Sequence, residues 1–233
     1  MTSKPTYSLA GAIKSVTCAV ALLWIIQSAG VLFNLPLSVL AVYPLEISRL
    51  HGVITSVLVH SGYEHLFNNT LPLLVLGSAL MYGYPKSRFK VIVITWIGSG
   101  LGVWLFGRES NHLGASGLAH GLFFYVFVVS ILRRDARSVA LMMIAFFMYG
   151  TMVLTIFPTE PNISYEAHFF GGLSGFIAAL IWWRKDPQLK RKTYSWENPD
   201  EPDDPQIARQ LSHDPDNPEK QDEPESFFDH TRH

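Results

Sequence analysis

The chain has 233 residues, of which 48% are hydrophobic and only 16% are charged, and its formal net charge is −1. So low a charge content is unusual for a soluble domain, and a net charge near zero gives no indication of a nucleic-acid partner. The single cysteine, Cys18, lies within an apolar run, which excludes a disulfide framework and a cysteine-rich metal site. Together with the long apolar segments, this composition predicts an all-α, polytopic membrane protein.

Six apolar segments follow one another along the chain. The first, 15–33, is uncharged and long enough to span a bilayer, and we expect it to be retained rather than cleaved as a signal peptide. The mixed segment 34–63 is too interrupted to span cleanly, so it is expected to lie in or on the membrane interface. The other five spans are expected at 65–84, 91–106, 116–132, 138–157 and about 167–183.

Basic residues separate the two sides of these six spans. One side holds Lys4, Lys14, the loops 86–90 and 133–137, and the segment after Trp183, whereas the other holds only Arg49 and Arg108. The positive-inside rule therefore predicts that both termini are cytoplasmic. We accordingly expect a cytoplasmic segment at 1–14, a six-helix membrane domain at 15–184, and an acidic, proline-rich tail at 185–233 that is disordered and cytoplasmic.

Three polar residues are expected at one depth. Asn69 lies 17 residues before Lys86, Ser116 lies 17 before Arg133, and His168 lies 16 before Arg184. At 1.5 Å per helical residue, each is about 24–26 Å above the inner boundary of a hydrocarbon layer about 30 Å thick. Polar groups there are costly without partners, which makes them functional candidates. They could instead be packing groups: a glycine-flanked serine at a tight helix contact, an interhelical asparagine, or a buried histidine bonded to a backbone carbonyl.

A serine and a histidine at one level form the simplest acyl-transfer pair, because the imidazole takes the hydroxyl proton and later returns it to the leaving amine. No Asp or Glu lies inside a span, and Glu166 is expected on another face of its helix than His168, so the residues favour a dyad. Asn69, with His65 and the backbone amide of Ser116, would stabilise a developing oxyanion.

A metal site is the alternative interpretation of the histidines. Six of them are expected on the outer side, namely His51, His60, His65, His112, His120 and His168. No cysteine or inward carboxylate accompanies them, so we expect neither a metal nor a cofactor.

Three motifs resemble those of the rhomboid family of intramembrane serine proteases. Residues 60–69 are similar to H-x4-H-x3-N, residues 114–117 to G-x-S-G, and residues 167–175 to A-H-x2-G-x3-G. The resemblance covers about residues 15–184 and implies a six-helix rhomboid-like bundle. It also implies roles for the site residues: Ser116 as nucleophile, His168 as general base and acid, Asn69 and His65 with Gly114 at the oxyanion site, and His60 as their support.

One position departs from the family pattern. Rhomboids often have an aromatic residue four positions after the nucleophile, stacked on the catalytic histidine, and here that residue is His120. It shares a helix face with Ser116, and we expect it to stack on His168, although it could also tune the pKa of His168 or compete as the base.

The function that the resemblance implies is endopeptidase cleavage, through an acyl-enzyme, in or near the transmembrane segments of membrane-protein substrates. The expected location is the cell (inner) membrane, as a multi-pass protein with its active site toward the outer side and lipid and transmembrane substrates as its partners. Residues 158–165 and the fifth span would resemble the gate through which substrate enters. The main alternative is a catalytically inactive rhomboid-like protein that binds or chaperones membrane segments. A small transporter is disfavoured, because no acidic or basic residue lies within the spans.

Overall fold

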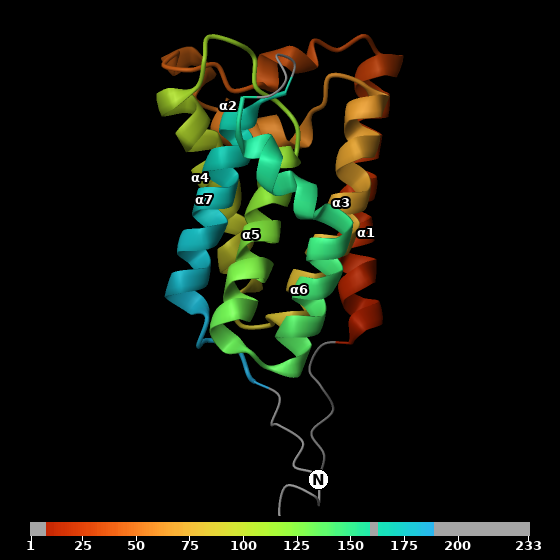
Figure 1. Ribbon diagram of the computed structural model, residues 1–233. Coiled ribbons are helices and arrows are strands. Elements are labelled where there is room, and N and C mark those ends of the chain that lie inside the picture. The colour runs from red at the N-terminus through yellow and green to blue at the C-terminus, as the bar shows by residue number, and fades with distance from the viewer. Residues whose placement is uncertain (1–7, 159–162, 189–233) are drawn as a thin grey trace, which may run out of the picture. The chain divides into compact units, whose positions relative to one another are not determined.

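The computed structural model describes residues 8–158 and 163–188, and within them every regular element is helical. The long helices are α1 (Leu9–Leu32), α3 (Tyr63–Gly83), α4 (Arg88–Phe106), α5 (Ser116–Arg133), α6 (Ala136–Tyr149) and α7 (Tyr165–Trp182). They lie side by side, and α5 packs against α3, α4, α6 and α7 (Figure 1). The all-helical class predicted from the sequence is confirmed.

Four helical stretches are long and apolar enough to cross a membrane. They are α1, α4, α5, and α6 together with the 3₁₀ helix η4 (Gly150–Ile156) that continues it. The helices α3 and α7 are less apolar because they carry the polar side chains of the predicted site, among them Asn69 and His168. These apolar helices indicate a multi-pass membrane protein, as the composition predicts.

Helix ends follow local capping signals. The Ser8 hydroxyl accepts a hydrogen bond from the Gly11 amide (3.0 Å), so α1 begins at Leu9, several residues before the predicted start at 15. Asp135 caps α6 and Ser164 caps α7 in the same way. The fifth span differs from the expectation of one uniform helix over 138–157, because its last seven residues form the 3₁₀ helix η4.

The segment between α1 and α3 folds into short helical turns over the end of the bundle at which α5 begins (Figure 1). These turns are η1 (Leu37–Leu40), η2 (Ile47–Arg49), α2 (Gly52–Thr55) and η3 (Ser56–Leu58). Val42 exchanges two backbone hydrogen bonds of 2.9 Å with His112, and the Arg49 guanidinium donates to Asn111 Oδ1 (2.8 Å). The segment therefore holds the loop that precedes Ser116.

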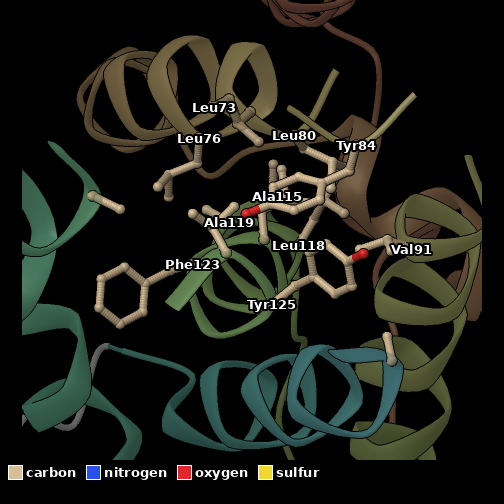
Figure 2. Close-up of a cluster of buried hydrophobic side chains, with 14 of the residues drawn as sticks. Leu73, Leu76, Leu80, Tyr84, Val91, Ala115, Leu118, Ala119, Phe123 and Tyr125 are labelled. Carbon is tan, nitrogen blue, oxygen red and sulfur yellow. The ribbon is translucent and has the colours of Figure 1, made fainter. Parts of the chain in front are cut away.

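The apolar core is centred on α3 and α5 (Figure 2). Leu76 and Leu80 of α3 face Ala119 and Phe123 of α5, and all four side chains are buried. Ala119 permits a close approach of the two helices because its side chain is a single methyl group. The core thus fixes α5, the helix that begins with Ser116.

A buried polar cluster closes the opposite end of the bundle. The Arg133 Nε donates to Asp135 (2.9 Å) and to Ser138 Oγ (3.1 Å). Its terminal nitrogens donate to the carbonyl oxygens of Trp183 (3.1 Å), Asp186 (2.9 Å) and Pro187 (2.9 Å). Arg133 therefore ties the end of α5 to the start of α6 and to the segment after α7.

Asp186 extends this cluster. Although the sequence places Asp186 in the expected tail, it is only 4% exposed, and its carboxylate accepts from the Lys86 amide (2.6 Å) and the Ser87 hydroxyl (2.5 Å). The chain is thus ordered slightly beyond residue 184, and the rest of the expected tail, from residue 189 on, lies outside the described residues.

Asp135 is ionised within this cluster. Burial alone would raise the pKa of Asp135, but hydrogen bonds from Ser138 and Arg133 outweigh burial and hold that pKa below its ordinary value. The stability that Asp135 contributes is therefore complete above the ordinary carboxyl pKa of about 4. That contribution is lost as the pH falls through the lower pKa of the folded state.

Replacing Arg133 is expected to destabilise the protein strongly. Arg133→Met would leave the Asp135 carboxylate and three carbonyl oxygens without their donor, so we expect a loss of about 3–5 kcal/mol in the free energy of unfolding. The neighbouring Arg134 is exposed, and Arg134→Met should change that free energy by less than about 0.5 kcal/mol. Equilibrium unfolding of both variants in mixed micelles measures the difference, and equal losses would contradict the role of the cluster.

Candidate active site

Ser116 is the first residue of α5 and follows a turn that requires glycine. Gly114 has φ +110°, a backbone conformation that residues with a side chain rarely adopt. A β-carbon at Gly114 would also lie 2.6 Å from the imidazole of His65. Gly114 therefore brings the loop before the serine directly against the first turn of α3.

Close packing of α5 against α7 brings the predicted dyad together. A β-carbon at Gly171 would lie 2.0 Å from the carbonyl oxygen of Gly117, and one at Gly175 would lie 2.0 Å from that of Gly121. Because backbone meets backbone, the helix with Ser116 runs beside the helix with His168 in its first turn.

His120 lies between the two predicted dyad residues. Its ring stacks on the ring of His168, with centroids 3.8 Å apart and an interplanar angle of 11°. Its Nδ1 is 2.7 Å from the carbonyl oxygen of Ser116. The hydrogen bonds of the described residues do not include one between the Ser116 hydroxyl and His168, a bond that often tightens only when substrate is bound.

The orientation of His168 is set by the chain that precedes α7. Its Nδ1 lies 3.0 Å from the carbonyl oxygen of Thr155 in η4. A carbonyl oxygen can only accept, so Nδ1 carries the proton of the neutral ring, and Nε2 keeps its lone pair. The imidazole is thus in the tautomer that a general base for a serine hydroxyl requires.

The predicted oxyanion residues lie beside the nucleophile loop, on α3 and just before it. The Ala115 amide donates to His60 Nε2 (3.3 Å), and the His60 and His65 rings meet edge to face with centroids 5.1 Å apart. Asn69 is buried one turn after His65 and donates to the His65 carbonyl (3.0 Å). His60, His65 and Gly114 are therefore brought together, while the amide of Asn69 is bonded within its own helix.

His60 is neutral in this arrangement. Burial lowers the pKa of His60 to about 4, and the neighbouring His65 lowers it further in the same direction. Because Nε2 accepts from the Ala115 amide, the proton of the neutral ring is on Nδ1. His60 acts here as a neutral acceptor that fixes the backbone immediately before Ser116.

Comparison with known proteins decides the family. The family model described as "Rhomboid domain" matches residues 47–185, which is more than half of the chain and includes all three motifs. The chain belongs to the rhomboid family. The resemblance seen in the sequence is therefore confirmed at the level of the family.

Individual relatives of this rhomboid come from bacteria and plants. The chain is 33% identical over 190 residues to "Uncharacterized protein Rv1337" of Mycobacterium tuberculosis, covering 77% of this chain and 78% of that protein. It is 27% identical over 139 residues to "Putative rhomboid protease YdcA" of Bacillus subtilis, covering 55% of this chain and 65% of the relative. "RHOMBOID-like protein 2" of Arabidopsis thaliana is 28% identical over 143 residues, covering 60% of this chain and 42% of the relative.

The acidic residue nearest in sequence to the histidine of this rhomboid has a different partner. Glu166 is buried and forms an ion pair with Arg108 (Oε1 to Nε, 3.7 Å), and its Oε1 also accepts from the Arg108 amide (3.3 Å). Among residues 8–158 and 163–188, no group of three or more His, Cys, Asp and Glu side chains is arranged to hold a metal ion.

Sequence reasoning missed two residues that organise the rhomboid site. Thr155 contributes a main-chain carbonyl to His168, and any residue type at that position would present the same atom. Ser164 caps α7, and its hydroxyl lies 2.6 Å from His112 Nδ1, which links the nucleophile loop to the helix of His168. A serine three residues before Ala167 is a recognisable capping signal, so Ser164 could have been found from the sequence.

Proposed function

We propose that this rhomboid is an intramembrane serine endopeptidase that cleaves peptide bonds in or near transmembrane segments of membrane-protein substrates. The observation that carries the proposal is the state of His168, whose Nδ1–H is engaged by Thr155 and whose Nε2 lone pair is left for a proton from Ser116. The stacked His120, bonded to the Ser116 carbonyl, keeps both residues beside the same ring. A packing role for the two residues would not need this tautomer.

The chemical steps follow from these positions. The Ser116 oxygen attacks the scissile carbonyl while His168 Nε2 takes the hydroxyl proton, and the oxyanion is stabilised by donors from Asn69, His65 and the Ser116 amide. The intermediate collapses when His168 returns that proton to the leaving amine, which leaves an acyl group on Ser116. Water then attacks the acyl-enzyme with His168 again as base, and the carboxylic acid product and the serine hydroxyl are restored.

The proposed topology has six spans with both termini in the cytoplasm. Helices α3 and α7 have 21 and 18 residues, about 32 and 27 Å at 1.5 Å per residue, and they pack against helices apolar enough to span. Hydrogen bonds among Lys86, Arg133 and Asp186 support one basic end of the bundle. The positive-inside rule assigns that end to the cytoplasm, and Ser116 to the outer half of the cell membrane.

The substrate class follows from this location. A site in the outer half of the bilayer meets transmembrane segments of other proteins, and a helical segment must unwind locally before its carbonyl can reach Ser116. Membrane-protein substrates and surrounding lipid are therefore the proposed partners.

Labelling with a serine-reactive fluorophosphonate tests this proposal. The purified protein in detergent should be labelled at Ser116, and labelling should be lost in both Ser116→Ala and His168→Ala, because the hydroxyl is unreactive without its base. Labelling that persists in His168→Ala would refute the dyad. A wild-type protein that is neither labelled nor active, but co-purifies with membrane segments, would instead support an inactive rhomboid-like binding protein.

A further inference from the structure

A continuous polar chain joins the two dyad residues through side chains that the proposed mechanism does not use. It runs from the Ser116 carbonyl to His120 Nδ1 (2.7 Å), and from His120 Nε2 to Thr155 Oγ1 (2.8 Å). It then continues from the Thr155 carbonyl to His168 Nδ1 (3.0 Å). His120 and His168 are 3% and 6% exposed, so water does not readily replace these bonds.

The donors and acceptors of this chain can be assigned from their chemistry. The Ser116 carbonyl only accepts, so the neutral ring of His120 carries its proton on Nδ1, and its Nε2 accepts from the Thr155 hydroxyl. The Thr155 hydroxyl also lies 3.0 Å from the Met152 carbonyl, and because a hydroxyl has one proton it donates to one of these acceptors at a time. The bond to His120 connects every member from Ser116 to His168.

Thr155 lies in a stretch of unusual backbone. It belongs to the seven-residue 3₁₀ helix η4 between α6 and the segment before α7. Runs of 3₁₀ helix longer than three or four residues are uncommon and often mark hinges. The carbonyl that orients the histidine is therefore supplied by a stretch whose position is set in part by its side-chain bond to His120.

We propose that His120 and Thr155 are positioning residues of the Ser116–His168 dyad. His120 supports one face of the His168 ring and, through the Thr155 hydroxyl, holds η4 so that its carbonyl fixes the Nδ1–H tautomer of His168. A movement of η4 away from α5 would break the bond to His120 and the bond to His168 together, so the reactivity of the dyad depends on the seat of η4. This inference rests on the proposed protease function only for its effect on rate, since the bond pattern itself is independent of activity.

Thr155→Val tests the hydroxyl alone, because valine has nearly the same shape and leaves the backbone carbonyl in place. Loss of one buried hydrogen bond should lower kcat and the rate of fluorophosphonate labelling about 3- to 10-fold, with KM unchanged. Thr155→Ser should restore both rates to within about twofold of the wild type, because it retains the donor. Thr151→Val, the same substitution at an exposed position of η4, is the matched control and should match the wild type.

The readouts separate positioning from an effect on substrate access. The small fluorophosphonate reaches Ser116 without a transmembrane segment, so an unchanged labelling rate with a raised KM would overturn the proposal in favour of a role in access only. An equal fall in Thr155→Val and Thr155→Ser would also overturn it, because the hydroxyl would not then be the group that matters.

His120 variants separate the ring from its nitrogens. His120→Phe keeps a flat ring against His168 but lacks the bond to Thr155, so it should resemble Thr155→Val. His120→Ala removes both the ring and the bond and should lower the labelling rate further, to at least tenfold below the wild type. If His120→Phe labels as fast as the wild type, the link through Thr155 has no role in the dyad.

Nitrogen-15 NMR of histidine-labelled protein gives a test that does not need activity. In Thr155→Val the His120 Nε2 signal should shift and the His168 ring signals should broaden or move, whereas Thr155→Ser and Thr151→Val should keep the wild-type pattern. If Thr155→Val moves neither histidine, the proposal fails even in an active enzyme. If the histidines shift as expected but no Ser116-dependent labelling occurs, the proposed protease function fails while the hydrogen-bonded chain stands.

Discussion

Ser116→Ala is expected to lower cleavage of a single-span substrate in liposomes by on the order of 10⁴- to 10⁶-fold, because the attacking oxygen is removed. His168→Ala should cause a comparable loss, since the serine proton then has no acceptor at neutral pH. The two residues act as one unit, so the double variant should be no slower than the slower single variant. Product formation over time, followed by gel and mass spectrometry, measures all three rates.

Two variants control for effects on folding. Ser174→Ala removes another hydroxyl from α7, one bonded to the Phe170 carbonyl, and His51→Ala removes a histidine bonded to Val39 outside the site. Both should cleave within a few-fold of the wild type. Cleavage by Ser116→Ala at the rate of these controls would rule out the dyad mechanism.

Gly171→Ala is expected to have the second-largest effect, on both stability and activity. The added methyl group would lie 2.0 Å from the Gly117 carbonyl oxygen, and because both atoms belong to helix backbones, α5 and α7 must move apart. We expect a loss of more than about 2 kcal/mol in the free energy of unfolding. A displacement of about 1 Å between Ser116 and His168 should also lower the cleavage rate by about 100-fold.

The adjacent Gly172→Ala is the matched control. Its methyl group would meet the Phe124 ring, a side chain that can shift, and alanine favours helix over glycine by about 1 kcal/mol. Gly172→Ala should therefore unfold and cleave nearly as the wild type does. If Gly171→Ala behaves like Gly172→Ala in mixed-micelle unfolding and in cleavage, the close contact of α5 and α7 does not hold the site together.

The long helices could be predicted from the sequence because apolar runs of membrane length are separated by basic or polar loops. Their ends could be predicted only approximately: Ser8 extends α1 toward the N-terminus, and hydrogen bonds of Asp186 keep residues after α7 ordered. The change from α-helix to 3₁₀ helix at Gly150 has no comparable signal, because Gly150–Ile156 is as apolar as the α6 helix before it.

The candidate site could be predicted where side chains carry the chemistry, and not where the backbone does. Ser116, His168, His65 and Asn69 stand out as polar groups in apolar helices, and the stacking expected of His120 corresponds to the observed ring geometry. The role of Thr155 depends on a main-chain carbonyl reached through the folding of η4 beside α7, which no residue pattern encodes.

The polar residues on α3 and α7 have a consequence for biosynthesis if both helices cross the membrane as proposed. Helices that carry such groups partition into lipid less readily by themselves than strongly apolar helices do. The helix α3 packs against α1, and α7 packs against α4 and α5, and these apolar partners all come earlier in the chain. Each reluctant helix thus leaves the ribosome after the helices that can shelter it, so the order of synthesis itself helps the catalytic helices into the bilayer.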